Sequence, residues 1–286
     1  MGKGPGFYSE IGKKTKDLLT KDYTYDQKFT VNTATSAGLV GVIALYRVIN
    51  FVTTGVKKGE VFAADISTNF KRNNITADVK VDTKSNILAT VTVDEFTAGA
   101  KSIFSFTIPD HKSGKVEVQY SHDHVGITSS IGLTPNPHVD VTAAIGSEGL
   151  VVGGEVGYDT ATGRLTKYNA GVGFTKPDFS TAVTLIDKGD TVKASYLHLI
   201  NPASRTQVAA EIAHKFSKNE NTFTVGGLYE LDPLTTLKGR LNNHGKMAAL
   251  LQHEWRPKSL VTISGEVDTK ALDKSAKIGL ALALKP

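Results

Sequence analysis

The amino-acid sequence predicts an all-β protein built around one large, closed antiparallel sheet. The first observation is a period of two from about residue 27 onward: in 76–82, Ala77, Val79 and Val81 share one face and polar side chains occupy the other. The same alternation recurs in three further segments, 115–122, 207–216 and 259–267. A period of two indicates strands with one apolar and one polar face. Helical periodicity is absent after residue 25, which is the second observation.

Regularly spaced turn signals are the third observation. Clusters of Asp, Asn, Gly, Pro and Ser separate the alternating segments at 110–114, 135–137, 159–163, 187–190 and 201–202. This spacing is typical of a large antiparallel meander. Because such a sheet must protect its edge strands, and full closure removes the edges, we expect a barrel.

Alternation alone leaves open which face of the barrel points outward. The polar face is dense in Lys, Asp, Glu, Gln, Ser and Thr, as a hydrated lumen requires. Aromatic side chains such as Tyr120, Tyr196 and Tyr229 lie on the apolar face near turns, where an interfacial girdle would place them. These features favour a membrane barrel; a soluble ligand-binding barrel is the alternative.

Composition and motifs exclude several other classes. The net charge of +5 is scattered, without a block of like charges or a nucleic-acid motif, and no cysteine is available for a disulfide, a thiolate metal site or a nucleophile. No transmembrane helix, secretory signal or matrix presequence is expected. Phosphate-binding and dinucleotide motifs are absent, and the pair His122 and His124 lacks a third ligand. We therefore expect no enzyme, no metal and no cofactor.

Residues 7–21 differ from the remainder of the chain. At helical spacing, Phe7, Tyr8, Ile11, Thr15, Leu18 and Leu19 fall on one side, and the charged residues fall on the other. The pattern predicts one short amphipathic helix. Such a helix either covers one end of the barrel or lies against the pore wall with its cations facing the channel.

Three stretches of the chain resemble the mitochondrial porins, the voltage-dependent anion channels, and particularly the plant ones. They are the opening "KGPGFYSEIGKKTKDLLTKDY", the segment 229–251, which matches the eukaryotic porin signature, and the C-terminal 277–284. The similarity covers the whole chain except residues 41–50. It implies a barrel of 19 strands whose first and last strands pair in parallel, the strand number known for this family. The turn signals suggest roughly eighteen or nineteen strands.

The resemblance also implies roles for individual residues. Domain boundaries follow at 1–25, helix and linker, and 26–286, barrel. The helix cations that meet permeating anions would be Lys13, Lys16 and Lys21. The signature residues are Tyr229, Asp232, Lys238, Arg240, Asn242 and Asn243. The signal for the outer-membrane assembly machinery would be Lys277, Gly279, Leu282 and Leu284.

The function that the resemblance implies is a voltage-gated, weakly anion-selective channel for ions and small metabolites, adenine nucleotides included. Its location would be the mitochondrial outer membrane, with the plastid outer membrane as the alternative. The expected partners are membrane lipid, permeating anions and nucleotides, the assembly machinery, further copies of the chain and cytosolic kinases. A scaffold that recruits cytosolic partners is a second expected function.

Two departures from the animal relatives concern gating. Val79 stands where animal relatives carry a membrane-facing glutamate in the fourth strand. Asp22 and Asp26, around Tyr23 and Tyr25, replace the glycines that loosen the link between helix and barrel. We therefore expect behaviour tied to that glutamate to be missing, and the hinge to be stiffer or differently placed.

The stretch Gly41–Asn50, "GVIALYRVIN", interrupts the first predicted hairpin. Neither strand parity suits it, because an outward Arg47 would cost roughly 2–4 kcal/mol at the membrane midplane, whereas an inward one puts Ile43, Leu45 and Ile49 in water. Its even length of ten preserves the parity downstream. We interpret it as an insertion bulging from the hairpin without chemistry of its own; a gate or partner motif is the rival interpretation.

Deleting Gly41–Asn50 tests this interpretation. Full-length and deleted proteins should show equal conductance and gating in planar bilayers, and the deleted protein should fold in better yield. Loss of gating, or of a binding partner, would instead assign the stretch a function.

Overall fold

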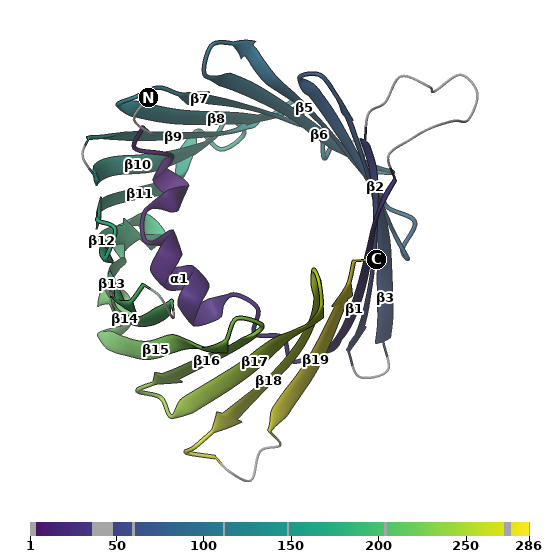
Figure 1. Cartoon of the computed structure of the whole chain (residues 1–286). Coiled ribbons are helices and arrows are strands. Elements are labelled where there is room, and N and C mark those ends of the chain that lie inside the picture. Colours follow the sequence, from purple (N-terminus) through teal and green to yellow (C-terminus); the bar gives the residue numbers. More distant parts are fainter. Residues whose placement is uncertain are drawn as a thin grey trace.

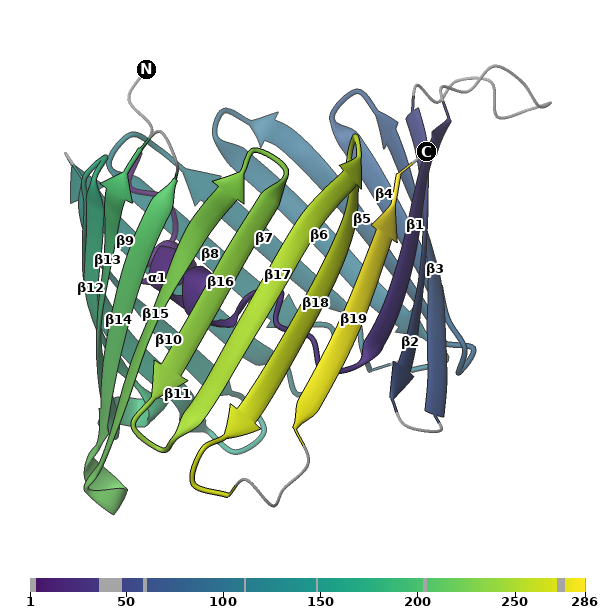
Figure 2. The same ribbon diagram turned by 60° about the horizontal axis from the view of Figure 1, so that its bottom comes forward.

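The computed structural model is a closed barrel with a helical segment inside it (Figures 1 and 2). It describes residues 4–35, 48–58, 61–110, 112–147, 149–202, 205–271 and 276–285. A single sheet of 19 strands forms the wall. None of the helices in these ranges is long and apolar enough to span a membrane.

The strands follow one another along the chain with short connections. Their bounds are β1 (Gln27–Thr35), β2 (Val48–Lys58), β3 (Val61–Arg72), β4 (Ile75–Asp82), β5 (Ile87–Thr97), β6 (Ala100–Ile108), β7 (Lys115–Ser121), β8 (Val125–Gly132), β9 (His138–Ser147), β10 (Leu150–Asp159), β11 (Arg164–Thr175), β12 (Phe179–Ile186), β13 (Thr191–Asn201), β14 (Thr206–Lys215), β15 (Glu220–Asp232), β16 (Thr235–Asn242), β17 (Lys246–Arg256), β18 (Ser259–Asp268) and β19 (Lys277–Leu284). All five predicted turns lie between strands or at their ends. One of them contains the one-turn 3-10 helix η3 (Asp187–Gly189), and a second such helix, η4 (Phe216–Lys218), connects β14 and β15.

Closure joins the first strand to the last. Each strand from β2 to β19 pairs antiparallel with the strand before it, but β1 and β19 pair in parallel, from Gln27 opposite Leu280 to Val31 opposite Leu284. An odd number of alternating strands leaves the two terminal strands pointing the same way, so only a parallel pair closes the ring. The expected strand number and parallel closure are confirmed.

The apolar face of the sheet points outward. Ile145 is 63% exposed and Ile263 49%, and their apolar neighbours along the strands are exposed as well. The alternate positions, which carry Asp140 and Glu266, face the lumen. An apolar band of this extent around the whole barrel needs lipid rather than water as its solvent. The expected membrane barrel is confirmed, and the soluble alternative is wrong.

The N-terminal segment is broken rather than continuous. It consists of η1 (Tyr8–Glu10) and α1 (Lys13–Thr20), separated by Ile11 in an extended conformation and Gly12 at φ +72°. The predicted short helix is confirmed, but it spans Lys13–Thr20 rather than all of 7–21. The backbone at Gly12 is left-handed, a conformation that glycine tolerates best, and it turns the chain at this point. As a result, η1 lies against β9 and β10, whereas α1 lies against β13 to β16.

Part of the stretch 41–50 belongs to the barrel. Val48 to Asn50 begin β2, where Ile49 pairs with Thr35 and Asn50 with Ala34. Residues 41–47 lie outside the described residues. The interpretation of the whole stretch as an insertion stays a prediction, and a shorter deletion of 41–47 leaves these strand pairs in place.

Candidate functional site

The helix α1 lies inside the barrel with its apolar face against the wall (Figure 1). Leu18 and Leu19 are buried, and they form one cluster with Leu197 of β13 and Ala209 of β14, against which Leu228 of β15 packs. Of the two positions predicted from the helical period, lying against the pore wall is therefore the one observed.

Small residues on the inner wall admit the N-terminal segment. A Cβ atom on Gly226 of β15 would lie 2.7 Å from Cδ2 of Leu19. The Cγ2 atom of Ile11 lies 3.3 Å from the corresponding position on Gly173 of β11. Gly12 lies over Ala182 of β12, with 3.5 Å between its ideal Cβ and the alanine Cβ. These wall positions have no room for longer side chains while the segment stays docked.

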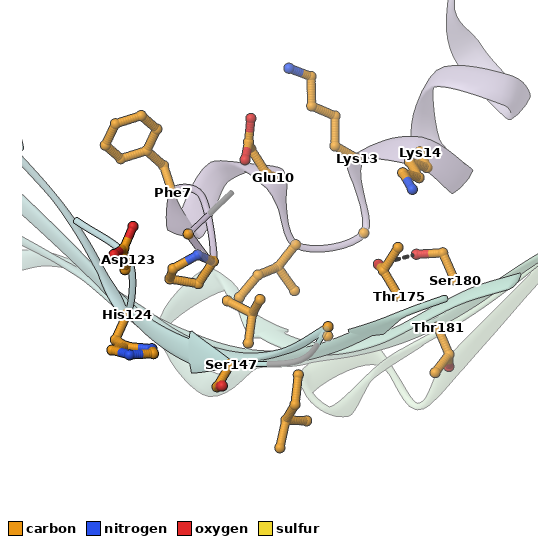
Figure 3. Close-up of a pocket in the computed structure, with 18 of the residues that line it drawn as sticks. Phe7, Glu10, Lys13, Lys14, Asp123, His124, Ser147, Thr175, Ser180 and Thr181 are labelled. Carbon is orange, nitrogen blue, oxygen red and sulfur yellow. Dashed lines mark hydrogen bonds between the residues drawn. The ribbon is translucent and has the colours of Figure 1, made fainter. Parts of the chain in front are cut away.

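The polar face of α1 points into the lumen. Lys13, Lys16 and Lys21, the three predicted anion contacts, are all exposed, and Lys13 points away from the wall (Figure 3). None of the three forms an ion pair with any described residue. The neighbouring Lys14 is exposed and also without an ion pair among the described residues.

The wall cations, in contrast, largely form ion pairs with acids on the same or a neighbouring strand. Four examples, with the distance from the lysine Nζ to the carboxylate oxygen, are Lys80–Asp65 at 3.0 Å, Lys101–Asp94 at 3.3 Å, Lys115–Glu117 at 3.4 Å and Lys193–Glu211 at 3.0 Å. Charges of the described wall that form no ion pair have both signs, among them Lys28, Lys71, Lys246, Asp78 and Glu254. The helix therefore carries the main concentration of unpaired positive charge.

A cavity of about 780 Å³ separates the start of the helical segment from the wall (Figure 3). Its charged side chains are Lys13 and Lys14 together with Glu10, Asp17 and Asp123, and the wall contributes Thr175 and Ser180, whose hydroxyls lie 2.9 Å apart. The lining thus mixes both signs of charge with hydroxyl groups. The described residues contain no group of three or more His, Asp or Glu able to hold a metal ion.

Arg240 of β16 holds the end of the helix and the linker that follows it. Its Nη1 donates to the carbonyl oxygen of Leu19 at 2.9 Å, and its Nη2 donates to the Tyr25 hydroxyl at 2.9 Å and to Glu266 at 3.0 Å. The Tyr25 hydroxyl donates to the same carboxylate at 2.8 Å. The guanidinium also lies 4.7 Å from the ring centre of Tyr23. One side chain thus joins helix, linker and two strands.

Two further contacts support the linker. Lys238, only 8% exposed, donates to Asp22 at 3.0 Å. Lys277 of β19 lies 5.8 Å from the ring centre of Tyr25. Burial raises the pKa of Tyr23 to about 12, although nearby Arg240 favours its charged form. Tyr23 is therefore neutral at physiological pH.

The signature residues fall into three groups. Lys238 and Arg240 face the lumen and hold the linker. Asp232, Asn242 and Asn243 accept backbone N–H hydrogen bonds in turns, from Leu234, Lys246 and Phe223 respectively. Tyr229 faces outward and is half exposed.

The predicted assembly signal occupies most of β19. Lys277 and Gly279 face the lumen, whereas Leu282 and Leu284 lie on the outer face, in register with Phe29 and Val31. Trp255 is exposed near the β17–β18 turn, and the guanidinium of Arg256 lies 4.8 Å from its ring centre. Val79 lies in β4, the fourth strand, as predicted.

Glu266 and Ser264 are the site residues that sequence reasoning missed. Both lie on the polar face of a predicted strand, but nothing local distinguishes them from other lumenal residues. The replacement of linker glycines by Asp22 and Asp26 was the available signal that the linker differs here.

A closed barrel with an apolar exterior, a charged interior and a docked helix defines a membrane pore. The family model described as eukaryotic porin matches residues 4–279. The porin of 36 kDa from the mitochondrial outer membrane of Solanum tuberosum is 55% identical over 286 residues, covering 100% of both chains. The outer plastidial membrane protein porin of Pisum sativum is 54% identical and mitochondrial outer membrane protein porin 1 of Arabidopsis thaliana 52%, each again over both whole chains.

The chain belongs to the eukaryotic porin family, a family of channels. The expected plant-type resemblance and the pore-forming function, passage of ions and metabolites, are confirmed. The expected outer-membrane location is confirmed too, and the names of the relatives include both the mitochondrial and the plastid membrane.

Replacing both Leu18 and Leu19 with Ala should release the helix from the wall. Each buried leucine contributes about 2–5 kcal/mol in a packed core. In detergent, trypsin should then cut within 13–21 much faster than in the parent protein. The control is the exposed pair Leu231 and Leu234, whose replacement with Ala should change nothing. Equal cleavage in both variants would contradict the docking described here.

Proposed function

We propose that the protein is a voltage-gated, weakly anion-selective channel for ions and small metabolites, adenine nucleotides included. The observation that carries the proposal is the contrast between a wall whose cations are largely paired with acids and a lumenal helix whose cations form no ion pair with any described residue. Barrels of 16 to 18 strands already leave an aqueous channel, so 19 strands leave a wide one. Selectivity then follows the sign of the unpaired lumenal charge.

The preference for anions is weak because the excess charge is small and hydrated. The segment carries Lys13, Lys14, Lys16 and Lys21 against Glu10 and Asp17. Such a patch raises the local concentration of anions without binding them tightly. Phosphate groups of nucleotides carry more charge than chloride, so they respond more strongly to the same field.

The proposed voltage sensitivity also depends on the charged N-terminal segment. Charges that lie within the transmembrane field respond to a voltage in proportion to the distance they move along it. The segment 4–25 carries charge but belongs to no strand of the barrel, so its displacement would cost no strand pairing.

Several partners stay predictions. Recognition of Lys277, Gly279, Leu282 and Leu284 by the assembly machinery is supported by their placement on the last strand. Homo-oligomers, and cytosolic kinases recruited to a scaffold, remain predicted from the family resemblance.

Purified protein in planar bilayers should form large pores with a modest preference for anions. The measurement is the reversal potential in a gradient of potassium chloride. A clear cation preference, or no conductance, would contradict the proposal.

Replacing Lys13, Lys16 and Lys21 together with Glu should lower the anion preference towards unity or reverse it, because the exposed face of the helix changes sign. The same reversal potential measures this. The matched control carries the same change in charge on turns, with Lys188, Lys218 and Lys258 replaced by Glu, and should retain most of the preference. Unchanged selectivity in the helix variant would show that this face does not line the permeation path.

A further inference from the structure

The linker between helix and barrel crosses the inner face of β18 and β19. The closing register sets its position: Gln27 pairs with Leu280, and the N–H of Leu280 donates to the carbonyl of Asp26 at 3.2 Å. The parallel partner of β19 thus begins partway along that strand. Upstream of Asp26 the chain turns into the lumen and passes over Gly279.

Gly279 has no room for a side chain. An ideal Cβ at this position would lie 2.6 Å from the carbonyl carbon of Thr24 and 2.8 Å from Cα of Tyr25, with the Thr24 oxygen closer still. All three are backbone atoms, so no flexible side chain can give way. A methyl group here forces the linker itself to move.

Ser264 completes the same seat from the neighbouring strand. It is the register partner of Gly279 and is 2% exposed. Its hydroxyl accepts a hydrogen bond from the N–H of Thr24 at 3.2 Å and donates to the carbonyl of the same residue. The linker backbone is thereby bonded in both directions, as a strand would bond it.

The contacts of Arg240 and Glu266 flank this seat. They fix Tyr25 on one side and the carbonyl of Leu19, at the end of α1, on the other. Raising the linker off Gly279 pulls Tyr25 away from both charged partners. The seat and the polar contacts therefore act on the same short segment.

We propose that the pair Gly279 and Ser264 is a linker seat that positions α1 inside the pore. Gly279 thereby has a structural role in the mature channel that is separate from its predicted role in assembly. The effect of the linker seat on ion selectivity rests on the function proposed above. The docking of the helix, however, can be measured without recording channel currents.

Because the chain contains no cysteine, a single introduced cysteine can be labelled selectively and can report whether the helix is docked. Thr15, 2% exposed beneath the helix, is replaced with Cys in the full chain, which is refolded in detergent so that the assembly machinery is not needed. A maleimide reaches this thiol only when the helix leaves the wall. Cys at the exposed position 16 (Lys16→Cys) reports the reactivity of an undocked thiol.

Gly279→Ala should accelerate labelling of Thr15→Cys by about tenfold or more, because undocking becomes more frequent. Ser264→Val changes the same linker seat at a residue that does not belong to the predicted assembly signal. It should likewise accelerate the labelling of Thr15→Cys. The matched controls are Gly132→Ala, a lumenal glycine whose Cβ would have 3.8 Å of room, and Ser105→Val on β6; both should leave the rate unchanged.

The outcomes separate the two claims. Faster labelling in the seat variants alone supports the seat, whatever the reversal potential shows. If Gly279→Ala does not refold, Ser264→Val decides. Unchanged labelling in refolded Ser264→Val, or equal acceleration in the controls, overturns the proposal while leaving the anion-selective pore untouched.

Discussion

The parallel pairing of β1 with β19 is the constraint on which the remaining structure depends. An odd number of strands closes in no other way, and the observed register begins β1 opposite Leu280 rather than at the start of β19. The residues before Asp26 leave the edge of β19 and pass over Gly279 on its inner face. The closing register thus sets where the N-terminal segment joins the barrel, and Gly279 provides the space for the linker in the lumen.

The division of charge between wall and helix follows from this geometry. Charges on a strand meet charges on the next strand at fixed spacing, so pairs such as Lys193 with Glu211 form across the sheet and cancel. The helix lies across the strands, and its apolar side faces the wall through Leu18 and Leu19. Its lysines form no ion pair with any described residue, which leaves them available to passing anions.

The sequence predicted what depends on local pattern. Alternation put Ile263 and Glu266 on opposite faces of one strand, and the polar composition of one face with the aromatic positions on the other favoured an outward apolar face. Helical spacing placed Thr15, Leu18 and Leu19 on one side of the helix. It missed the break at Gly12, because the periodic pattern continues through a single left-handed residue. It also missed the contact of Tyr25 with Glu266, which joins residues 241 positions apart and exists only once the barrel has closed. Strand count and parallel closure came from family resemblance, supported by the turn signals.

The linker is fixed to the inner wall while the helix is docked, and solid-state NMR of isotope-labelled protein in lipid bilayers can test this. A fixed linker gives cross-peaks between the Tyr25 ring and the side chains of Glu266 and Arg240, together with a rigid backbone at Thr24. A mobile Tyr25 without cross-peaks to either residue, in a barrel whose β1–β19 pairing is intact, would contradict it.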